Sequence, residues 1–193
     1  IGDICCKHDI LIISDEVHSD LIFSDKIHHP IASISEEIAN RTITLNAPSK
    51  TFNLAGLLTA AVIISNNDLR SKYARTLESH GFTTGNLFGI EAFENAYKFG
   101  EKWLNELLIY LEDNYKYLRN LLESETPLIK PTETDGTYLV WLDCRDLKLP
   151  QSELNEFFIY EALLGLNSGT QYGKNGEGFM RMNIACPRKI LEK

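Results

Sequence analysis

Two ionisable side chains stand directly after segments that have the composition of buried β-strands. Asp15 follows the apolar residues 10–14, and Lys50 follows the β-branched residues 42–45 and Pro48, which lacks the N–H needed for a sheet hydrogen bond. Ligands of open α/β sheets bind beyond the carboxyl ends of the strands. We therefore expect both side chains at a ligand-binding edge, where an amine that loses part of its hydration becomes a usable nucleophile.

Each candidate residue also has a simpler interpretation. Lys50 could be a solvated surface charge, and Asp15 could cap the segment that follows it. His18 with Asp15 and Asp20 imitates a metal cluster, but one histidine and two carboxylates are a poor transition-metal set, so no metal is predicted. Arg181 lies on a predicted strand and could pair with a surface carboxylate.

The elements that must position these residues follow from periodicity and turn residues. Strands are expected at residues 10–14, 42–45, 57–64, 138–142 and 179–185, and helices at 34–39, 68–79, 87–99, 103–122 and 152–164. Three side chains, Asn66, Asn67 and Asp68, offer an N-cap for the helix that runs to about Ser79, and Gly81 supplies its stop. This order predicts an α/β fold with a mostly parallel sheet over residues 1–99, then a long interdomain helix and a smaller α+β domain over residues 100–193.

Charge and composition argue against several classes of partner. The 193 residues carry 19 Lys+Arg against 27 Asp+Glu, a net charge of −8 without a basic run, which disfavours nucleic acid. The longest apolar runs are far shorter than the ~20 residues of a membrane span, so no membrane association is expected. The four cysteines form no CxxC pair, and Cys5 and Cys6 are adjacent, from which we infer reduced thiols and a cytoplasmic location.

Four blocks of sequence together resemble the class I/II aminotransferase family of pyridoxal-phosphate enzymes (fold type I), and within it the MalY/PatB-type branch of cystathionine β-lyase-like enzymes. The blocks are residues 14–21 around Asp15-Glu16-Val17-His18, residues 49–57 around Ser49-Lys50, residues 136–145, and residues 176–188 around Arg181-Met182-Asn183. The likeness covers almost the whole chain. It implies pyridoxal 5'-phosphate as the cofactor and an amino acid as the small-molecule substrate.

The resemblance also implies a role for each matching residue. Lys50 would carry the cofactor and act as the catalytic base, while Asp15 would pair with the pyridine nitrogen. His18 would contact the phenolic oxygen, Val17 one face of the ring, and Ser49 the phosphate. Arg181 is implied as the clamp for the substrate carboxylate.

Two positions depart from the wider family. Serine three residues before the lysine, as in some relatives, is Ala47 here, and the phosphate-binding arginine of many aminotransferases is Leu58. The second departure favours the lyase branch and leaves part of the phosphate contact unassigned.

The expected activity is a carbon–sulfur β-lyase that converts S-substituted cysteines to a thiol, pyruvate and ammonia. An aminotransferase would use the same residues, and a non-catalytic α/β binding module is a third reading. Because members of the family are about twice as long, the chain is expected to be the C-terminal half of a homodimeric enzyme, with the rest of the site supplied from outside it.

Overall fold

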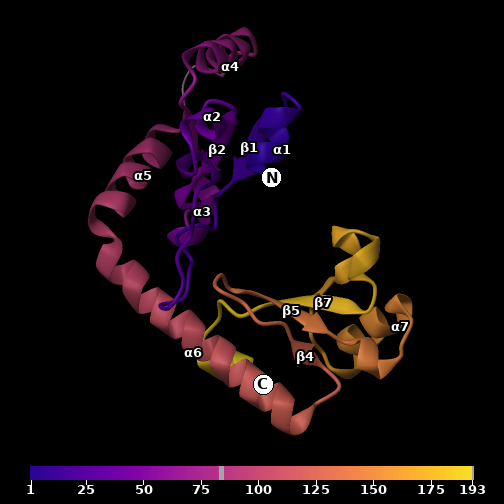
Figure 1. The fold of residues 1–193 in the computed structure, drawn as a ribbon. Helices are drawn as coiled ribbons and strands as arrows, with labels where there is room; N and C mark the ends of the chain where they lie inside the picture. The colour runs from indigo at the N-terminus through magenta and orange to yellow at the C-terminus, as the bar shows by residue number, and fades with distance from the viewer. Residues whose placement is uncertain (83–84, 193) are drawn as a thin grey trace. The chain divides into compact units, whose positions relative to one another are not determined.

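The computed structural model describes residues 1–82 and 85–192, which form two compact units (Figure 1). The first unit comprises Ile1–Ile22 and Ile27–Glu106, and the second comprises Phe23–Lys26 and Leu107–Lys193. The short segment Phe23–Lys26 belongs to the second unit because the Phe23 amide donates to the Asp135 carbonyl at 2.9 Å and Lys26 pairs with the Asp135 carboxylate.

The first unit is built on a three-stranded sheet with the order β1-β2-β3. Strands β1 (Ile12–Asp15) and β2 (Thr42–Asn46) are parallel, with Asp15 opposite Leu45, whereas β3 (Ala61–Ile64) is antiparallel to β2. Helices α1 (Gly2–Lys7) and α2 (Glu36–Ala39) lie close together, and α2 packs Ile38 into the core. The buried apolar side chains of this unit include Ile12, Leu21, Ile38, Ala47 and Ile64.

The connection between β2 and β3 contains two short helical segments, α3 (Pro48–Thr51) and the 3-10 turn η2 (Ala55–Leu57). The third strand was expected at residues 57–64 but begins only at Ala61. Leu58 explains the difference, because its φ of 49° lies in the left-handed region, which breaks an extended chain. Two longer helices follow, α4 (Asn67–Ser79) and α5 (Leu87–Phe99).

The second unit packs helix α6 (Glu101–Glu125, of which residues 107–125 belong to this unit) with a four-stranded antiparallel sheet. Its strands have the order β4-β5-β7-β6, and the two central ones, β5 and β7, lie side by side in Figure 1. The strands are β4 (Lys130–Pro131), β5 (Leu139–Asp143), β6 (Asn167–Ser168) and β7 (Phe179–Asn183). Its buried apolar side chains include Leu111, Leu118, Val140, Leu142, Leu154, Phe158, Met180 and Ile184.

Two further helices complete this unit, α7 (Gln151–Glu156) and α8 (Arg188–Leu191). The helix expected at residues 152–164 is α7 together with the π-helical turn Phe157–Glu161. It ends earlier than expected because Leu163 has a φ of 56°, outside the helical region.

No helix in residues 1–82 and 85–192 is both long enough and apolar enough to cross a membrane.

Candidate functional site

Asp15 and Lys50 lie beyond the same edge of the first sheet. Since β1 and β2 are parallel neighbours, their carboxyl ends emerge together, and the Glu16 amide extends the pairing by donating to the Leu45 carbonyl at 2.8 Å. Asp15 is the last residue of β1, and Lys50 lies on α3, just beyond β2. The predicted placement of both residues at strand ends is confirmed, and both side chains are exposed.

The turn after β1 carries two more candidates, Val17 and His18, which are both half-buried. The Val17 amide donates to Asp15 Oδ1 at 3.3 Å, so Asp15 does cap the following turn, as its simpler interpretation proposed. The Leu21 amide donates to the His18 carbonyl at 3.0 Å, and the Leu21 side chain is fully buried. The turn is therefore anchored to the core while Asp15 faces solvent.

Glu16, next to Asp15, has the opposite environment. Its side chain is buried, Oε1 accepts a hydrogen bond from Ser14 Oγ at 2.9 Å, and Oε2 lies 3.0 Å from His28 Nε2. A buried carboxylate needs such partners, because an unpaired one would lose its hydration without compensation. Glu16 is thus a structural anchor for the site, a role that its adjacency to Asp15 in sequence does not reveal.

The Lys50 turn buries one side and exposes the other. Pro48 occupies the first helical position, where its missing N–H costs nothing, and the Phe52 amide closes the turn by donating to the Pro48 carbonyl at 2.9 Å. Ala47, Pro48 and Thr51 are buried, whereas Ser49 is half-buried and Lys50 exposed. The fold therefore holds the backbone at Lys50 while leaving its amine accessible.

A polar cluster that we did not predict lies beside this turn. Asp20 Oδ2 accepts hydrogen bonds from Thr51 Oγ1 at 2.8 Å and from Tyr97 OH at 2.7 Å. Partial loss of hydration, followed by the hydrogen bond to the Asp20 carboxylate, raises the pKa of Tyr97 above its usual range, although 40% of the residue is exposed. Tyr97 thus remains a neutral donor. The sequence did not indicate this contact, because Tyr97 lies on α5, far from Asp20 along the chain.

Arg181 lies in the second unit, on the central strand β7, with Trp141 as its partner on β5. Its Nη2 donates to Asn167 Oδ1 at 3.1 Å, and its Cζ lies 4.8 Å from the centroid of the Tyr172 ring. Among the described residues its Nε is buried without a hydrogen-bond partner, and no ion pair forms with a carboxylate. The guanidinium is held in place with donor capacity to spare, which suits it to receive a carboxylate from a ligand.

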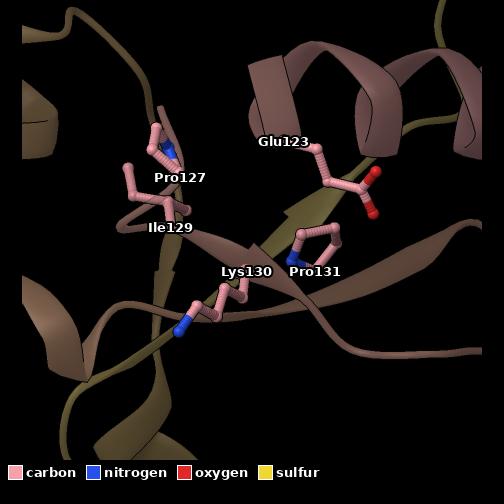
Figure 2. A pocket seen from close by; sticks show the side chains of 5 residues that line it. All are labelled: Glu123, Pro127, Ile129, Lys130 and Pro131. Carbon is pink, nitrogen blue, oxygen red and sulfur yellow. The ribbon is translucent and has the colours of Figure 1, made fainter. Parts of the chain in front are cut away.

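Three hollows of the second unit are lined by residues other than the predicted site residues. The one in Figure 2, with a volume of about 340 Å³, is lined by Glu123, Pro127, Ile129, Lys130 and Pro131. It offers one carboxylate and one ammonium group among apolar side chains. Within the part of the chain that the structure describes, no cluster of three histidine, cysteine or acidic side chains could hold a metal ion.

Known proteins match this chain from end to end. Cystathionine beta-lyase PatB of Bacillus subtilis (strain 168) is 39% identical over 192 residues, which are 100% of this chain and 50% of that protein. A PLP-bound protein from Clostridium difficile 630 has a TM-score of 0.96 at 39% identity, over 99% of this chain and 49% of its own. Cystalysin from Treponema denticola, whose structure contains pyridoxal 5'-phosphate, has a TM-score of 0.92 at 37% identity, over 99% of this chain and 48% of its own.

The chain thus spans about half the length of the curated relatives it matches. The superpositions confirm the expected α/β fold. Residues 1–193 also match the family model of aminotransferase class I and II. The chain therefore belongs to the class I and II aminotransferase family.

Proposed function

We propose that the full-length protein is a pyridoxal-phosphate-dependent carbon–sulfur β-lyase that converts S-substituted cysteines such as cystathionine to a thiol, pyruvate and ammonia. The observation that carries the proposal is the position of Asp15 and Lys50 at one edge of two adjacent parallel strands. The likeness to cystathionine beta-lyase PatB supports the reaction, and the cofactor in cystalysin supports pyridoxal phosphate.

The side chains at this edge fit the cofactor chemically. An aldehyde needs an amine, which Lys50 offers, and a pyridine nitrogen that stays protonated needs a carboxylate, which Asp15 offers. Adjacent strands lie ~4.8 Å apart, and the two strand ends are level because Asp15 pairs with Leu45. Both groups are exposed and so open to a ligand.

Bound pyridoxal phosphate withdraws electrons from the Cα atom of the substrate, which makes the Cα proton removable. Asp15 would hold the proton on the ring nitrogen, because a neighbouring carboxylate favours the charged form. Lys50 would hold the aldehyde carbon and, once the substrate amine displaces it, would accept the Cα proton at Nζ.

The remaining candidates would orient cofactor and substrate. We propose that His18 contacts the phenolic oxygen, that Val17 packs on a ring face and that Ser49 binds the phosphate. Arg181 would hold the substrate carboxylate with two parallel hydrogen bonds, an arrangement supported by its free donor capacity and by its attachment to Asn167 and Tyr172.

The match to the class I and II aminotransferase model favours a second candidate, transamination. The same residues would serve until the Cα proton has left, after which a lyase would expel the β-substituent and an aminotransferase would pass the amino group to an oxo acid. Pyruvate released from cystathionine without an added oxo acid, measured with lactate dehydrogenase and NADH, supports the lyase. Strict dependence on an oxo-acid acceptor overturns it in favour of transamination.

The assignment of Lys50 is tested in the same full-length protein. Lys50→Ala should abolish pyruvate release and cofactor attachment, and borohydride reduction followed by peptide mapping should place the cofactor on the Lys50 peptide. Lys72→Ala, which changes an exposed lysine of α4, is the matched control and should keep both properties. Cofactor on another peptide, or the absence of a visible absorption band when cofactor is added, would contradict the assignment, the latter in favour of a non-catalytic module.

We further propose that residues 1–99 are the second part of the cofactor-binding large domain and that residues 100–193 are an interdomain helix and most of the small domain. The two compact units support this division, although their boundary lies at Glu106, within α6. A cytoplasmic homodimer is the proposed assembly. Light scattering on a sizing column would show a mass twice that of the polypeptide, and a monomer would refute it.

A further inference from the structure

Asp20 joins the turn that carries Lys50 to helix α5. Its Oδ2 atom accepts hydrogen bonds from the hydroxyl groups of Thr51, at 2.8 Å, and Tyr97, at 2.7 Å. Thr51 is the residue after Lys50 and is fully buried. We propose that Asp20 is a positioning residue for Lys50, because it fixes the backbone from which the lysine projects. The inference rests on the proposed function of Lys50.

Tyr97 extends the same contact to the end of strand β2. Its hydroxyl also lies 3.2 Å from Oδ1 of Asn46, the last residue of β2. One phenolic proton cannot serve two acceptors fully, and the shorter distance and the negative charge both favour Asp20. The strand end, the turn after β1, the Lys50 turn and α5 are therefore joined by the Asp20 carboxylate together with the Tyr97 hydroxyl.

A second, apolar attachment holds the other end of the turn. Phe52 packs edge-on against Tyr97, with ring centroids 5.2 Å apart, and lies 5.8 Å from the Trp103 ring. Gly100 makes room for it, since a Cβ atom there would lie 2.5 Å from Phe52 Cε1. Tyr97 thus supports the turn in two ways: its ring contacts Phe52, and its hydroxyl is linked to Thr51 through the Asp20 carboxylate.

The turn needs such external support. Helix α3 has four residues, too few to fix its own orientation with internal hydrogen bonds. Because Lys50 is exposed, its own side chain is not what anchors it, and its direction is set by the buried neighbours Ala47, Pro48 and Thr51. A displacement of reacting atoms by about 1 Å can lower a rate about 100-fold.

Three variants remove parts of the network while keeping most of the shape. Thr51→Val and Tyr97→Phe each delete one hydroxyl group, and Asp20→Ala deletes the shared acceptor. Asp20→Asn is the rescue variant, because an amide oxygen at the position of Oδ2 can still accept both hydrogen bonds. Tyr73→Phe is the matched control for the loss of a phenolic hydroxyl group, because Tyr73 is half-buried and lies on α4, outside the network.

The first measurement is hydrogen–deuterium exchange of the amides of residues 49–53 in the full-length protein without added cofactor. Loss of one hydrogen bond should speed exchange there about 5- to 10-fold in Thr51→Val and in Tyr97→Phe, and loss of both in Asp20→Ala should speed it at least as much. Asp20→Asn and Tyr73→Phe should stay near the wild-type rate. Unchanged exchange in Asp20→Ala overturns the proposal.

The second measurement is the rate at which added pyridoxal phosphate becomes fixed to Lys50, followed by borohydride reduction and mass mapping. We expect it to fall about 10-fold or more in Asp20→Ala and to recover in Asp20→Asn. A lower melting temperature without a slower rate, or an Asp20→Asn variant no better than Asp20→Ala, would show a merely structural role. If the wild-type protein fixed no cofactor at Lys50, the proposed function would fail, while the exchange data would still decide whether Asp20 fixes the turn.

Discussion

The side chain of Asn114 provides a sharp test of how the second unit is held together. Asn114 is fully buried on α6, and its Nδ2 donates to the carbonyls of Ile184 at 3.0 Å and Cys186 at 3.1 Å. Its Oδ1 accepts from Arg188 Nε at 2.9 Å. One amide thus holds the chain beyond β7 and the start of α8 against α6.

Asn114→Leu keeps the approximate volume and removes all three hydrogen bonds. Leaving a buried carbonyl unsatisfied costs about 1–3 kcal/mol, and each of the two half-buried partners adds about 0.5–1.5 kcal/mol. The expected loss is therefore about 2–6 kcal/mol, a large fraction of the roughly 5–15 kcal/mol that stabilises ordinary domains. Equilibrium urea unfolding of the full-length protein, followed by fluorescence, measures it.

The matched control is Asn120→Leu, the same substitution at an exposed position of the same helix. It should change the free energy of unfolding by less than about 0.5 kcal/mol. If Asn114→Leu cost no more than this control, the three hydrogen bonds would contribute nothing net. The claim that a single amide fastens this segment to α6 would then be wrong.

Three further predictions concern buried groups. Burial raises the pKa of the Cys144 thiol to about 12 from 9.0. The stability that the neutral thiol contributes is therefore complete below pH 9.0 and is lost as the pH rises toward 12. At pH 8 the Cys144 thiol should react with a disulfide reagent only as fast as the protein opens. Gly100→Ala would press on the Phe52 ring and should cost about 1–3 kcal/mol in thermal unfolding, and an unchanged melting temperature would contradict this. Thr42→Val removes a buried hydrogen bond of 2.7 Å to the Ile38 carbonyl and should cost about 1 kcal/mol in the same assay, whereas a stabilised variant would refute it.

Elements with strong local signals were predictable from the sequence. Helix α4 begins where Asn66 accepts hydrogen bonds from the amides of Asp68 and Leu69, and the chain turns at Gly81 with a φ of 77°. The long α6 follows from its apolar period. The start and direction of β3 were not predictable, because the left-handed conformation of Leu58 depends on tertiary structure and Leu is not a residue that favours it.

The candidate site divides in the same way. Asp15 is the last residue of β1 and Lys50 lies on the short helix that follows β2, so their common edge could be inferred from strand composition and parallel pairing alone. The partners that hold the Lys50 turn could not, because Asp20, Thr51 and Tyr97 meet only when α5 has packed beside α3. Sequence patterns report one segment at a time, whereas these hydrogen bonds join segments 31 and 77 residues apart.

The Lys50 side chain is exposed whereas Pro48 and Thr51 in the same turn are buried, and this difference suits the role proposed for Lys50. An amine that must first hold a cofactor and then accept a proton has to change position at Nζ, so a side chain buried in the core would be unsuitable. A freely moving backbone would be equally unsuitable, because each turnover would then require the entropy of ordering it again. Exposure of Lys50 between buried Ala47, Pro48 and Thr51 meets both requirements, since the packed neighbours hold the backbone while the Lys50 side chain lies in solvent. Any substitution that loosens Thr51 should therefore affect chemistry at Lys50 more than it affects the stability of the sheet.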